Sequence, residues 1–124
     1  MIIDSTFMTR EKISTINFDI SLQSESYQNK VLRPILKDSN DKLILLTEKH
    51  LLSLNKDFSN ESKAKRESGI KNLFGKNQAF RNLIKGMIVG NMDIEELSLF
   101  LEQEKEMTKR IIQMAEERFK SQHF

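Results

Sequence analysis

The stretch DIEELSLFLEQEKEMTKRIIQMAEERF, residues 93–119, contains the clearest structural signal in this chain. Asp93 precedes Ile94, and Glu96 stands three residues after Asp93, which is the spacing of a capping box at a helix N-terminus. Apolar residues then recur every three or four positions, as in a helix that is buried along one side. The stretch predicts one helix of about 28 residues, roughly 40 Å long. Its predicted seam consists of Ile94, Leu97, Leu101, Thr108, Ile111, Ala115 and Arg118, flanked by Phe100, Met107, Met114 and Phe119.

A second long helical pattern covers about residues 25–56. Its apolar stripe follows the helical period and consists of Leu32, Leu36, Leu43, Leu46, His50 and Leu54, with Ser39 at the intervening position. Pro34 interrupts this pattern, and an interior proline removes one backbone hydrogen bond and clashes with the preceding turn. The sequence therefore predicts either a kink at Pro34 or a helix that begins there, since proline suits the first turn.

Two shorter helices are expected between the long ones, over residues 61–73 and 78–89. Asn77 fits the N-cap of the second, and Gly75 fits the end of the first. Gly86 stands four residues before another glycine, which indicates close approach of a neighbouring helix. No stretch alternates as a strand would. The sequence thus predicts an all-α fold: a four-helix bundle over residues 24–124, preceded by a partly mobile N-terminal arm over residues 1–23.

The composition excludes several classes of protein. The chain has 124 residues, enough for one ordinary domain. It has no cysteine, which excludes disulfide scaffolds, zinc–thiolate sites and cysteine nucleophiles. One proline and four glycines are too few for a turn-rich β-sandwich or barrel. The longest uncharged stretches are far shorter than the roughly 20 apolar residues of a membrane span, so we expect a cytoplasmic protein that has no membrane partner.

Basic residues are concentrated in the middle of the chain. Residues 61–90 hold seven positive and two negative side chains, whereas residues 91–124 hold five positive and eight negative ones. The basic segment supplies the candidate contacts to phosphate or nucleic acid, which are Lys63, Lys65, Arg66, Lys71, Lys76, Arg81 and Lys85.

Three interpretations of this basic segment stay open. Its charges are solvated or paired within the chain, or they bind nucleic acid, or they meet the acidic last helix of another copy. The first is favoured because surface charges usually need no function. Residues 63–85 also have a superficial likeness to a helix-turn-helix motif, but an amphipathic core helix explains the same pattern.

The sequence contains no recognisable set of catalytic or metal-binding residues. His50 lies on an apolar stripe without a second ligand at metal-binding spacing, so we expect a structural role for it. Glu102 and Glu106 share a helix face but lack the histidine of a di-iron bundle motif. No glycine-rich phosphate loop or nucleophile elbow is present. We therefore expect no catalytic residues, no metal and no cofactor.

The stretch FRNLIKGMIVG, residues 80–90, resembles a recurrent stretch of a short, uncharacterised helical family of Bacteroidetes bacteria. LRPILK (32–37) and KRII (109–112) resemble other stretches of that family in the same order, so the resemblance covers about residues 28–120. Members sometimes carry an automatic "glyoxalase" label. The glyoxalase fold needs strands and His and Glu ligands that this sequence lacks, so the resemblance implies a small helical protein without catalytic residues.

Together these patterns predict a non-enzymatic interaction or assembly module, with nucleic-acid binding through residues 63–85 as the alternative. The partner is expected to be another protein or a second copy of the chain. The last helix carries more apolar residues than one seam accommodates, and an exposed apolar patch usually marks a contact. The expected self-association residues are Phe100, Met107, Met114 and Phe119.

Overall fold

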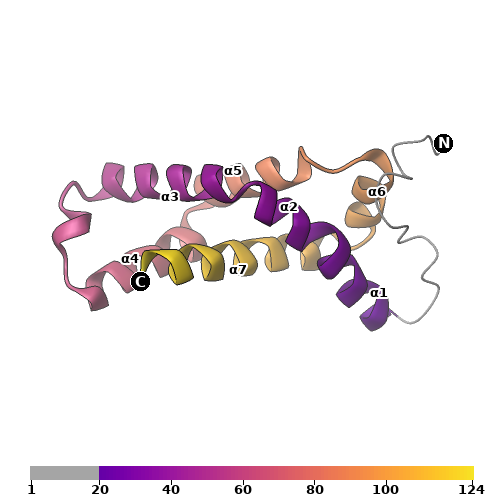
Figure 1. The fold of residues 1–124 in the computed structure, drawn as a ribbon, viewed down its shortest axis with the longest axis horizontal. Coiled ribbons are helices and arrows are strands. Elements are labelled where there is room, and N and C mark those ends of the chain that lie inside the picture. Colours follow the sequence, from indigo (N-terminus) through magenta and orange to yellow (C-terminus); the bar gives the residue numbers. More distant parts are fainter. Residues whose placement is uncertain (1–19) are drawn as a thin grey trace.

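The computed structural model describes residues 20–124, and almost all of them are helical (Figure 1). No strand occurs within this range, which confirms the all-α prediction. The α-helices are α1 (Ile20–Tyr27), α2 (Arg33–Asp38), α3 (Asn40–Leu54), α4 (Lys63–Lys76), α5 (Gln78–Val89), α6 (Ile94–Glu102) and α7 (Glu104–His123). Residues 1–19 of the predicted arm lie outside the described residues, and residues 20–23 belong to α1. No helix within the described range combines the length and apolar character needed to cross a bilayer.

The predicted helix over residues 25–56 is divided. Pro34 lies in the first turn of α2, and the residues before it form a π-helical turn over Gln28–Leu32. There the amide of Arg33 donates to the carbonyl of Gln28, five residues back. This wider turn lets the helical path continue into proline, which has no amide to donate. The helix instead ends at the buried Ser39, whose ψ of 8° departs from helical geometry.

The prediction of one unbroken C-terminal helix is wrong. Gln103, with φ −134° and ψ 40°, separates α6 from α7. The two halves have different neighbours: the Tyr27 hydroxyl of α1 donates to the Glu96 carbonyl of α6 at 2.8 Å, whereas α7 contacts α3, α4 and α5. Because each half packs against its own neighbours, the chain bends between them. Two seam positions of α6, Ile94 and Leu101, are consequently exposed.

The shorter helices follow the prediction more closely. α5 has the predicted bounds, and the Asn77 side chain caps it by accepting from the Phe80 amide at 3.0 Å. α4 starts later than predicted because a 3₁₀ turn occupies Phe58–Asn60, and Ser62 caps the helix. α4 also continues through Gly75, which is therefore no helix end.

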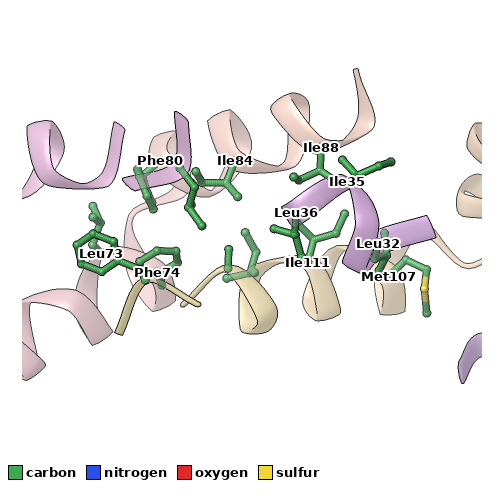
Figure 2. Close-up of a cluster of buried hydrophobic side chains, with 14 of the residues drawn as sticks. Leu32, Ile35, Leu36, Leu73, Phe74, Phe80, Ile84, Ile88, Met107 and Ile111 are labelled. Atoms are coloured by element: carbon green, nitrogen blue, oxygen red, sulfur yellow. The ribbon is translucent and has the colours of Figure 1, made fainter. Parts of the chain in front are cut away.

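The core lies between the pair α3 and α5 and the pair α4 and α7 (Figures 1 and 2). Phe80 of α5 packs edge-on against Phe74 of α4, with ring centroids 5.0 Å apart, and Phe74 in turn lies 6.4 Å from Phe119 of α7. Leu32, Ile35 and Leu36 of the first helical segment approach Ile88, Met107 and Ile111 in Figure 2. Side chains of α7 therefore contact core residues from most of the other helices.

Gly86→Ala is expected to raise the free energy of unfolding by about 0.5–1 kcal/mol, because glycine is unfavourable inside a helix. The added Cβ would meet no atom within 4 Å, so the close helix approach predicted at Gly86 is wrong. Gly69→Ala is the matched control. Its Cβ would lie 3.0 Å from Phe58 Cε1, so the propensity gain should be cancelled by the strained contact. Urea unfolding followed by circular dichroism checks both, and equal gains would contradict the explanation.

Candidate binding groove

The seven basic residues predicted as phosphate contacts do not form one surface. Lys65 and Lys76 lie eleven residues apart, about three turns, and share the outer side of α4. Lys71 is rotated by about 120° around that helix. Arg81 and Lys85 belong to α5 and face a different part of the fold. The basic residues are close together in the sequence, but the helical rotation places them on different sides of α4 and α5.

Five of the seven have partners within the chain. These contacts are Lys63 over the Phe124 ring at 5.6 Å, Lys65 with Glu61 at 3.9 Å, Arg66 with the Glu61 carbonyl at 3.1 Å, Arg81 with the Phe74 carbonyl at 2.6 Å, and Lys85 with Glu104 at 2.7 Å. Lys71 and Lys76 make no hydrogen bond or ion pair with any described residue. This pairing leaves no continuous stripe of free charge along α4.

His123 completes a small cluster beside the start of α4. Arg66 Nη1 donates to His123 Nε2 at 3.1 Å, and the His123 ring stacks on Phe119. Burial of the imidazole, followed by the charge of Arg66, lowers the pKa of His123. The uncharged ring therefore fits this cluster, which joins α4 to the end of α7.

A groove of about 830 Å³ lies where α5 and the end of α4 meet α7. Arg81 and Lys85 line it from α5, and Lys105 and Lys109 line it from α7. Its apolar surface consists mainly of the stems of these long residues, because Phe74 and Ile112 line the groove but are only 0% and 4% exposed. Along α7 the groove runs from Glu104 to Glu116, about 18 Å at 1.5 Å per residue.

The charges in the groove are only partly balanced. Glu104 pairs with Lys85 at 2.7 Å, and Glu116 pairs with Lys120 at 3.4 Å. Lys105 and Lys109 make no ion pair or hydrogen bond with a described residue. Thr108, which lies between them in sequence, has a buried hydroxyl oxygen without a hydrogen-bond partner among the described residues. The groove therefore presents two ammonium groups that have no partner among the described residues, whereas the Thr108 hydroxyl is buried.

Lys105 and Lys109 were missed from the sequence because they belong to a segment whose net charge is negative. Their spacing of four places both ammonium groups on one side of a helix, next to Ile112. That local pattern is the signal that could have identified them.

The predicted self-association residues lie mostly inside the molecule. Phe100, Met107 and Phe119 are buried, and Met114 is half-buried. Met107, Met114 and Phe119 belong to α7, which is covered by α3 as well as by the shorter α4 and α5, whereas Phe100 belongs to α6 and is part of the same core. Among the residues whose burial the structure describes, 24–124, the exposed large apolar side chains are instead Leu45, Leu52, Leu54, Leu83, Ile94, Leu101 and Phe124.

His50 is half-buried on α3. Its Nδ1 donates to the Leu46 carbonyl at 2.9 Å, and its ring lies 5.1 Å from that of Phe80. Residues 20–124 contain no group of three or more His, Asp or Glu side chains placed to hold a metal ion. Through these contacts the His50 ring packs α3 against α5.

No protein-family model, curated protein or solved structure matches this chain. The resemblance to a helical family of Bacteroidetes therefore stays a prediction.

Proposed function

We propose that the chain is a non-enzymatic interaction module whose groove binds an acidic, partly apolar segment of a protein. The observation that carries this proposal is the pair of ammonium groups of Lys105 and Lys109, which have no partner among the described residues and line a groove rich in aliphatic side-chain stems. Carboxylates would pair with the lysines, and apolar side chains would pack on the stems of the residues that line the groove. The proposed scaffold is a four-helix arrangement of α3, α4, α5 and α7.

A protein segment suits this groove better than nucleic acid. A phosphate backbone needs a run of uncompensated cations, since counterion release supplies most of its affinity. Here Glu104 and Glu116 stand at the two ends of the groove, and most of the basic residues 63–85 are paired within the chain. The two groove carboxylates, Glu104 and Glu116, each pair with a lysine. This pairing suits binding of a charged partner better than acid–base catalysis.

The proposal predicts binding of a labelled helical peptide that carries two leucines seven residues apart, each followed by a glutamate. We expect a Kd of roughly 10–100 μM by fluorescence anisotropy, weakening as salt is added. The double variant Lys105→Ala/Lys109→Ala should weaken binding roughly tenfold, since two exposed ion pairs are worth up to about 1 kcal/mol each.

The matched control is Lys71→Ala/Lys76→Ala, which removes two equally unpaired lysines outside the groove and should leave peptide binding unchanged. A 20-base-pair DNA duplex in the same assay should bind no tighter than about 10 μM at physiological salt. Submicromolar, salt-sensitive DNA binding that is abolished by substituting Lys63, Lys65, Arg66 and Lys71 would support the alternative function instead.

A further inference from the structure

We infer that the segment which fills this groove is α6 of a second copy of the chain, so that two copies bind each other through α6 and the groove. This inference rests on the proposed function and names its partner. Its starting point is the outer face of α6, where Ile94 and Leu101 are 60% and 55% exposed although both are large and apolar.

The outer face of α6 has two rows of opposite character. Ile94 and Leu101 lie seven residues apart, two turns along the helix, and form the apolar row. Glu95 and Glu102 follow them by one residue each and form an acidic row beside it. The face therefore presents two apolar side chains and two carboxylates over about 10 Å.

This face complements the groove in charge, apolar character and length. Glu95 and Glu102 match the two free ammonium groups of Lys105 and Lys109, whose long side chains cover the difference in spacing. The apolar row can pack on the aliphatic stems of the lysines and the arginine that line the groove. α6 has nine residues, about 14 Å, and fits within the roughly 18 Å between Glu104 and Glu116.

Both surfaces lie near the same point in the chain, because only Gln103 separates α6 from the first groove residue. Two copies related by a two-fold axis can then place each α6 in the other's groove, which closes the assembly as a dimer. Within one copy, the contact of Tyr27 with the Glu96 carbonyl holds α6 with its outer face exposed.

A competing apolar surface on α3 lacks this complementarity. Leu45 and Leu52 are also exposed and seven residues apart. Glu48 and Lys49 lie between them, so charges of both signs flank that surface. The α3 surface therefore has no net negative charge that would pair with the lysines of the groove.

The test is sedimentation equilibrium of the full chain from about 5 to about 500 μM. We expect a reversible monomer–dimer equilibrium with a dissociation constant in the tens of micromolar, weakened by added salt. The variants Lys105→Glu/Lys109→Glu and Glu95→Lys/Glu102→Lys should each reduce association at least tenfold. Mixed in equal amounts, the two variants should restore it, because each α6 then meets a groove of opposite charge.

Two further variants serve as a charge control and as a test of the apolar contact. Lys71→Glu/Lys76→Glu carries the same charge change outside the groove and should dimerise like the original chain. Leu101→Ser removes apolar contact from an exposed position, where the fold does not depend on it, and should weaken dimerisation without a charge change.

The outcomes separate this inference from the proposed function. A chain that stays monomeric at every concentration, yet binds the peptide in its groove, overturns the dimer and leaves the groove as a binding site. A dimer that is indifferent to both charge reversals overturns the α6–groove contact. Recovery of dimer in the mixture of reversed variants supports it.

Discussion

Phe80→Ala is expected to lower the free energy of unfolding by about 3–5 kcal/mol, the usual cost of truncating a fully buried phenylalanine. The ring lies 5.0 Å from that of Phe74 on α4 and 5.1 Å from that of His50 on α3. Its loss would leave a cavity where three helices meet. Domains of this size have a total stability of about 5–15 kcal/mol, so the change removes a large share of it.

Urea unfolding followed by far-ultraviolet circular dichroism measures this loss. Leu83→Ala is the matched control, because Leu83 lies on the same helix and is 40% exposed. It should cost less than about 1 kcal/mol. Similar losses in the two variants would mean that the α3–α4–α5 junction is not the centre of the core.

The Tyr27 phenol is expected to stay protonated well above the pH at which a free tyrosine ionises. Burial raises the pKa of Tyr27 most, and the nearby carboxylates of Glu96 and Asp93 raise it further. The hydroxyl also donates to the Glu96 carbonyl at 2.8 Å. Because this is the one tyrosine of the chain, ultraviolet titration of tyrosinate reports on it alone.

The sign of the stability effect follows from the raised pKa. The unfolded chain loses this proton near pH 10 and the folded chain loses it only at higher pH, so the contribution is complete below pH 10 and declines above it. Tyr27→Phe should remove that alkaline decline and cost about 1 kcal/mol at neutral pH through the lost hydrogen bond. Tyrosinate absorbance that rises near pH 10 while the helices persist would refute the buried-phenol explanation.

Local signals in the sequence predicted local structure well. The capping box of Asp93 and Glu96 is present, with hydrogen bonds of 2.7 and 2.9 Å, and Asn77 caps α5 as expected. Both devices involve groups within three residues of one another. Their geometry is therefore contained in the sequence spacing itself.

The helix breaks at Ser39 and Gln103 could not be predicted in the same way. Hydrophobic periodicity shows that a segment has one buried side, but it does not show which neighbour covers that side. α6 and α7 share a continuous apolar period, yet Tyr27 contacts one and the phenylalanines of α4 and α5 belong to the core around the other. The bend between them is a consequence of tertiary packing.

The candidate groove was predicted only in part, for a related reason. Arg81 and Lys85 were named from the basic segment, but Lys105 and Lys109 come from the acidic last segment. Segment charge averages over all sides of a helix, whereas a binding surface takes one side from each of several helices. Met107 and Phe119 illustrate the converse case: the last helix has more apolar residues than one neighbour can cover, and α7 buries these two because it contacts α3, α4 and α5.

The central position of α7 has a consequence for how the chain is made. The helices that α7 contacts most, α3 to α6, all precede it in the sequence. A ribosome adds about 5–20 residues per second, so α3 waits roughly 4–14 s for the helix that covers its inner face. During that interval the apolar sides of α3, α4 and α5 have only one another to pack against. Core closure therefore waits for the synthesis of α7, and until then the apolar sides of these three helices are open to contacts with other chains.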